Sequence, residues 1–169
     1  VEVFVDRETL LETSINALAV EEDESIYIVV DDNENNAYDG GLLYVAIEDA
    51  NAGGAIVKKD SARIDNNADY VEDFGEQGTN GWYYMFGKSV KQSGIVSSKT
   101  ADGFMNYTSP ALQIGEQFIH PAINDNAIIG WEPAIGGQIE IRGTYTKFEQ
   151  NDGNPDWPDG VTVQIYLNE

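Results

Sequence analysis

Residues 138–148 read QIEIRGTYTKF, and their alternation is the clearest indication of the fold class. In an extended chain every second side chain points to the same face. One face here holds Ile139, Ile141, Gly143, Tyr145 and Lys147, and the other holds Glu140, Arg142, Thr144, Thr146 and Phe148. Residues 161–167, VTVQIYL, repeat the pattern, with Thr162, Gln164 and Tyr166 on the polar face. A period of two predicts long strands that each bury one face.

Other short alternating or β-branched runs lie between turns rich in Asp, Asn and Gly. Such runs predict further strands. They cover Val1–Val5, Thr9–Ile15, Ser25–Val30, Leu42–Ile47, Trp82–Phe86, Phe104–Thr108, Gln117–His120 and Ala127–Trp131. The segment 7–18 comes closest to a helical pattern, but Thr9, Thr13 and Ile15 favour a strand and turn there. We therefore predict an all-β, antiparallel two-sheet β-sandwich of the jelly-roll-like kind.

The length and net charge of the chain limit its number of domains and its possible partners. The 169 residues suit a single domain, 1–169, with a core large enough to need no disulfides, and the chain has no cysteine. Thirty acidic residues against nine basic ones give a net charge of −21. Such a surface repels nucleic acids and anionic membranes, so we expect neither as a partner. No apolar run approaches the roughly 20 residues of a membrane-spanning helix.

Three groups of segments carry a resemblance. The first group is residues 78–84, GTNGWYY. The second group has three segments, which are 119–121, IHP, 127–133, AIIGWEP, and 137–143, GQIEIRG. The third group is residues 159–168, DGVTVQIYLN. Together they resemble the β-sandwich accessory modules, of carbohydrate-binding type, that secreted bacterial polysaccharide-degrading enzymes carry. The resemblance implies a sandwich fold, a polysaccharide partner and a secreted or cell-surface location.

The order of the segments departs from that family. The resemblance assigns residues 1–49 to the C-terminal part of the usual module and 68–169 to its N-terminal part, with 50–67 as a linker. We consider two explanations, a circularly permuted single domain and a window across two repeats of a tandem array. The second would allow strand exchange with a neighbouring chain or repeat.

Sugar binding needs flat aromatic faces for stacking and polar groups for the hydroxyls. Trp157 stands in a proline-stiffened polar loop and is the leading ligand candidate, followed by Tyr38 in another Asn/Asp loop. Trp82 and Tyr84 share one strand face, with Tyr83 and Met85 on the other, and the pattern leaves open which face is core. Trp131, inside an Ile-Ile-Gly-Trp run, is expected in the core.

Two polar residues complete the candidate ligand site. His120 is the only histidine in the sequence. It would either make a polar contact with ligand on a ligand-facing sheet or have a purely structural role. Arg142 lies opposite the Ile139 and Ile141 row, where it would contact ligand or form a surface ion pair. No motif of a serine hydrolase or zinc protease is present. A carboxylate pair for glycoside hydrolysis is the remaining alternative, but thirty acidic residues make a chance pair expected, so we expect no catalysis.

Calcium is the expected cofactor, in a structural role. Two loops are rich in oxygen ligands of the kind Ca²⁺ prefers. The first supplies Asp31, Asp32 and Asp39, and the second supplies Asp152, Asn154, Asp156 and Asp159. Turns use the same residue types without any metal, which is the alternative explanation.

These observations favour a non-catalytic carbohydrate-binding module that docks a secreted or surface protein onto a polysaccharide. The net charge favours a neutral glycan over a polyanionic one. The alternative is a structural or adhesive β-sandwich repeat of a large bacterial surface protein, without a glycan site.

Overall fold

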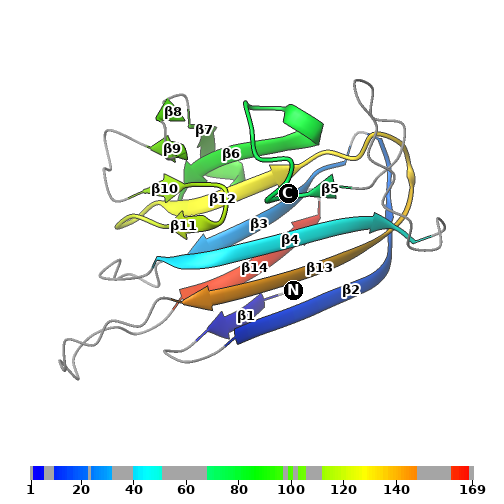
Figure 1. Cartoon of the computed structure of the whole chain (residues 1–169), viewed down its shortest axis with the longest axis horizontal. Coiled ribbons are helices and arrows are strands. Elements are labelled where there is room, and N and C mark those ends of the chain that lie inside the picture. The colour runs from blue at the N-terminus through cyan, green and yellow to red at the C-terminus, as the bar shows by residue number, and fades with distance from the viewer. Residues whose placement is uncertain are drawn as a thin grey trace.

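The fold is an all-β sandwich of two antiparallel sheets, as the sequence predicted (Figure 1). The computed structural model describes residues 2–5, 10–22, 24–31, 40–50, 68–96, 99–100, 103–105, 112–147 and 161–167. The first sheet contains β1 (Glu2–Val5), β14 (Val161–Leu167), β3 (Ile26–Asp31), β12 (Asn126–Trp131), β6 (Trp82–Gly87) and β7 (Ser93–Ile95), in that order. We refer to it as the six-stranded sheet.

The second, eight-stranded sheet contains β2 (Leu10–Val20), β13 (Gly137–Lys147), β4 (Gly41–Asp49), β11 (Phe118–His120), β10 (Gln113–Ile114), β9 (Gly103–Met105) and β8 (Lys99–Thr100), with β5 (Ala68–Asp69) paired to β4. Two short 3-10 turns, Thr79–Gly81 and Val90–Gln92, flank β6. In the described parts of the chain, no helix is long and apolar enough to cross a membrane.

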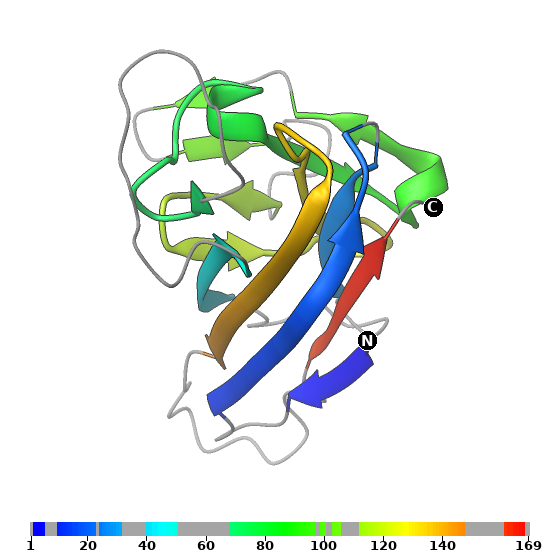
Figure 2. The same cartoon turned by 90° about the vertical axis from the view of Figure 1, so that its right-hand side faces the viewer.

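Strands from the two ends of the chain share both sheets. In the six-stranded sheet β3 lies between β14 and β12, and in the eight-stranded sheet β4 lies between β13 and β11. Figure 1 shows these blue and cyan strands among yellow, orange and red ones. β1 runs antiparallel beside β14, with Glu2 opposite Gln164 (Figure 2). In the usual module, the strand that corresponds to 161–167 comes before the segment that corresponds to 2–5. In this protein the two segments are β14 and β1, and they are neighbours in one sheet.

The long strands were predicted well, whereas the shortest were not. β13 and β14 match the predicted ranges to within one residue. β2 is longer than predicted because the ladder continues past an irregularity, where Ala17 has a φ of 56° and the pairing with β13 shifts between Ile139 and Ile141. β5, β8 and β10 have two residues each and carry no periodic signal.

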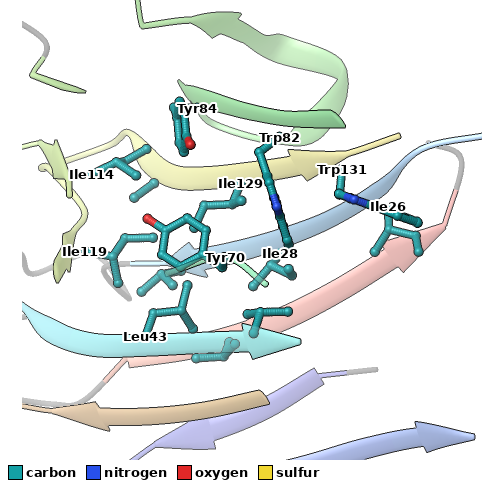
Figure 3. Packing of buried hydrophobic residues seen from close by; sticks show 14 of the residues in the cluster. Ile26, Ile28, Leu43, Tyr70, Trp82, Tyr84, Ile114, Ile119, Ile129 and Trp131 are labelled. Atoms are coloured by element: carbon teal, nitrogen blue, oxygen red, sulfur yellow. The ribbon is translucent and has the colours of Figure 1, made fainter. Parts of the chain in front are cut away.

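The core lies between the sheets and is rich in aromatic rings (Figure 3). Tyr70 packs edge-on against Trp82, with ring centroids 5.6 Å apart, and Tyr84 stacks on Phe104 at 4.4 Å. Trp131 is fully buried, as predicted. The alternation in β13 is also confirmed, because Ile139, Ile141, Tyr145 and Lys147 are all buried.

Candidate functional site

Two of the predicted ligand contacts belong to the core. The side chains of Trp82 and Tyr84 are 0 % exposed. Figure 3 shows Trp82 pointing from β6 into the interior, toward Ile28. The hydroxyl of Tyr84 accepts a hydrogen bond from the backbone N–H of Gly75 at 3.1 Å. The prediction that these two rings contact ligand is therefore corrected, since a buried ring offers no face for stacking.

His120 lies half-buried on β11 of the eight-stranded sheet. Its Nδ1 donates to the backbone carbonyl of Pro121 at 2.5 Å, and its ring lies 6.1 Å from that of Phe118. Burial lowers the pKa of His120, and the hydrogen bond to Pro121 opposes that shift. Packing and a backbone partner thus account for this histidine.

Arg142 is exposed on β13 and is held by carboxylates. Its Nε donates to Glu140 Oε1 at 2.8 Å, and its guanidinium lies 4.0 Å from Glu48. The hydrogen bond to Glu140 raises the pKa of Arg142 above its usual value. This arrangement is the surface ion pair that the sequence left open as the alternative.

The remaining predicted site residues lie mostly outside the described part of the chain. Those outside are Trp157, Tyr38, Asp32, Asp39, Asp152, Asn154, Asp156 and Asp159, as is 51–67 of the predicted linker. Asp31 is described and half-buried at the end of β3. Among the described residues, no three His, Cys, Asp or Glu side chains are grouped as a metal site.

The anchors of the two predicted calcium loops nevertheless lie side by side. Segment 32–39 joins β3 to β4, and segment 148–160 joins β13 to β14. Asp31 is paired with Thr162, and Gly41 is paired with Lys147. The two acidic segments thus leave from, and return to, neighbouring strands at one end of the sandwich.

The outer face of the six-stranded sheet carries a row of tyrosines that the sequence did not single out. Tyr166 of β14 is paired with Tyr27 of β3, Tyr27 with Gly130 of β12, and Gly130 with Tyr83 of β6. With neighbouring strands roughly 4.8 Å apart, Tyr27 and Tyr83 flank the glycine at a backbone separation of about 10 Å. All three tyrosines are partly exposed.

Gly130 creates a hollow in this row. Any Cβ at position 130 would stand 3.4 Å from ring carbons of Tyr27 and 3.5 Å from Sδ of Met85, so both side chains close over the bare backbone. The open hollow has a volume of about 170 Å³. Its lining consists of Ser25, Tyr27, Tyr83, Met85, Ile95, Gly130, Trp131 and Glu132. We call this set the tyrosine hollow.

Glu132 stands at the rim of the tyrosine hollow. The hydroxyl of Tyr83 donates to Glu132 Oε2 at 3.1 Å, and the backbone N–H of Glu132 donates to the carbonyl of Gly81 at 3.0 Å. Burial, together with the neighbouring Glu132 carboxylate, raises the pKa of Tyr83. The phenol therefore remains a neutral donor, and the hollow combines aromatic surface with a fixed carboxylate.

A signal for this site was present in the sequence. In 25–30, Tyr27 alternates with Ile26 and Ile28, and Tyr166 stands on the polar face of 161–167. A tyrosine on the outward face of an otherwise regular strand indicates a surface role. The alignment of these residues with Gly130 depends on strand pairing, which no local pattern contains.

Comparison of the chain with protein-family models, curated proteins and solved structures gave no match.

Proposed function

We propose that this protein is a non-catalytic glycan-binding β-sandwich and that the tyrosine hollow is its sugar site. The observation that carries the proposal is the cross-strand row Tyr27–Gly130–Tyr83, in which two partly exposed rings flank a glycine gap. Pyranose rings present C–H groups that stack on aromatic surface, while hydroxyl and carboxylate groups take the sugar hydroxyls.

The dimensions of the hollow suit a weak, shallow site. Its volume of about 170 Å³ is below the roughly 300–1,000 Å³ of pockets that enclose a small molecule. A hollow of this kind contacts one or two units of a longer chain and leaves the rest in solvent. Affinity for a polysaccharide would then be gained through several copies or sites acting together.

The surroundings of the hollow give it polar partners on a rigid base. β12 pairs along its length with both β3 and β6, so three strands hold the floor of the site. The Glu132 carboxylate and the Tyr83 hydroxyl are positioned by their mutual hydrogen bond. Rigid side chains lose little conformational entropy on binding, which favours recognition by a small contact area.

Affinity electrophoresis on a panel of soluble polysaccharides tests the proposal. We expect retardation on at least one polymer, and we expect Tyr83→Ala to weaken it about tenfold, the loss of one stacking ring. Tyr44→Ala is the matched control, because Tyr44 is 40 % exposed on β4 of the other sheet. Retardation on no polymer, or loss in Tyr44→Ala alone, would overturn the proposal and favour a structural repeat.

The location that we propose follows from the resemblance to accessory modules of secreted enzymes. We place the protein outside the cell, as part of a secreted or surface protein that it docks onto a polysaccharide. A net charge of −21 keeps such a domain soluble, and the acidic loops offer oxygen ligands for a structural Ca²⁺.

A further inference from the structure

The tyrosine hollow has a distinct electrostatic character. Among the described residues that line it, Glu132 alone carries a charge. The chain as a whole has a net charge of −21, which adds a long-range negative potential. A sugar bearing carboxylates or sulfates would therefore approach against repulsion, and a sugar bearing a positive charge would be attracted.

The carboxylate of Glu132 is suited to accept a charged donor. It already accepts the hydroxyl hydrogen of Tyr83 at 3.1 Å, and that bond holds Oε2 next to the phenol oxygen. The two oxygens of a carboxylate have about four acceptor positions, so one carboxylate can accept several donors at once. Hydrogen bonds from an ammonium group to a carboxylate are about twice as strong as those between neutral groups.

The aromatic rings add a second attraction for the same charge. A cation near the face of a tyrosine ring is attracted by the ring quadrupole. Tyr27 and Tyr83 flank Gly130, and Glu132 stands beside Tyr83 at the rim. Tyrosine faces next to a carboxylate form an environment that prefers an ammonium group to a hydroxyl or an acetamide.

We propose that the tyrosine hollow selects glycans with free amino groups, of the glucosamine type, by placing the sugar ammonium at Glu132 and Tyr83. This inference rests on the proposed function, since it names the class of glycan for the same site. It replaces the expectation of a neutral glycan with that of a cationic one, which a net charge of −21 also favours.

Calorimetric titration with three matched oligosaccharides tests the inference. The probes are the tetramers of glucosamine, of N-acetylglucosamine and of glucose, at a pH where the amine is protonated. We expect the glucosamine tetramer to bind at least about tenfold more tightly than the other two, as expected for one charge-assisted contact. Glu132→Gln should remove this advantage, and it should lower the affinity for the two neutral tetramers by a smaller factor, because the amide still accepts and donates hydrogen bonds to sugar hydroxyls.

Two controls separate site binding from general attraction to an acidic protein. Glu116→Gln removes the same charge from an exposed position in the turn between β10 and β11 of the other sheet, and it should keep the advantage. Tyr83→Phe keeps the ring and every charge but removes the hydroxyl that positions Glu132. It should reduce the preference for the amine without unfolding the domain.

The outcomes distinguish the two proposals. Equal binding of all three tetramers, still sensitive to Tyr83→Ala, would overturn the amine preference and leave a glycan site. An amine preference that survives Glu132→Gln, or equal binding of a lysine oligomer, would also overturn it. Binding of none of the tetramers, together with no retardation on any polysaccharide, would remove the proposed function itself.

Discussion

Gly130 of β12 lies directly opposite Tyr27 of β3, and ring carbons of Tyr27 would stand 3.4 Å from any Cβ at position 130. The glycine therefore has a spatial role, because it lets the ring close over the strand and leaves the hollow beside Tyr83. Glycine in a strand interior otherwise weakens the strand, since it adds backbone entropy and no side-chain packing.

This relationship predicts opposite effects of Gly130→Ala on stability and on binding. A contact of 3.4 Å is tolerable, so the fold should survive with stability unchanged or higher by about 0.5 kcal/mol. Glycan affinity should fall about fivefold or more, because the methyl group occupies the floor of the site. Denaturant unfolding and affinity electrophoresis measure the two effects.

Gly94→Ala on β7 of the same sheet is the control for Gly130→Ala. A Cβ there would approach only the Phe86 ring, at 4.0 Å, so binding should be unaffected. If Gly130→Ala binds polysaccharide as well as the original protein does, the hollow is not the sugar site.

The assignment of Trp82 and Tyr84 to the core gives a second prediction. Trp82→Phe should cost about 1–3 kcal/mol of unfolding free energy through lost packing. Tyr84→Phe should cost about 1 kcal/mol, because the Gly75 N–H loses its partner. Both variants should retain full polysaccharide binding once folded. A folded variant of either kind that fails to bind would return these rings to the ligand site.

The sequence predicted what depends on local alternation. Ile139, Ile141 and Tyr145 were placed on the buried face of their strand because one face of that strand is apolar and the other polar. β6 offers no such contrast, since both of its faces carry aromatic or apolar side chains. Which face became core was decided by the opposing sheet.

Local sequence patterns could not predict the candidate site for a related reason. Tyr27, Tyr83 and Gly130 come from three distant segments, and only the register of β3, β12 and β6 aligns them. Asp31 and Thr162 illustrate the same limit, because each flanks an acidic segment and their pairing brings the two segments' anchors together.

The pairing of Asp31 with Thr162 makes the calcium prediction more specific, because both acidic segments can then contribute to one site. If the acidic residues of 32–39 and 148–160 hold Ca²⁺, binding to the folded state alone should raise stability with calcium concentration. We expect a chelator to lower the melting temperature by roughly 5 °C and excess Ca²⁺ to restore it. Asp156→Asn should reduce this response, whereas Glu116→Gln on the far sheet should not. A melt that neither chelator nor Ca²⁺ changes would contradict a structural ion.

The buried phenols predict how the protein unfolds in alkali. Burial raises the pKa of Tyr84 to about 12 and that of Tyr70 well above its usual value near 10. In the unfolded chain both would lose their protons near pH 10. Because the folded-state pKa values are the higher ones, the contribution of both phenols to stability is complete below about pH 10 and is lost at higher pH, for Tyr84 as the pH rises through about 12.

Tyrosinate absorbance and near-ultraviolet circular dichroism, followed together during an alkaline titration, measure tyrosine ionisation and unfolding. The reversible part of the absorbance change should appear first, while the fold persists. The last portion of the absorbance change should appear only as the dichroism signal disappears, since Tyr70, whose hydroxyl donates to the Gly115 carbonyl at 2.6 Å, ionises only on unfolding. Tyr84→Phe should reduce that last portion. Reversible ionisation of every tyrosine near pH 10 with the fold intact would contradict the burial of both rings.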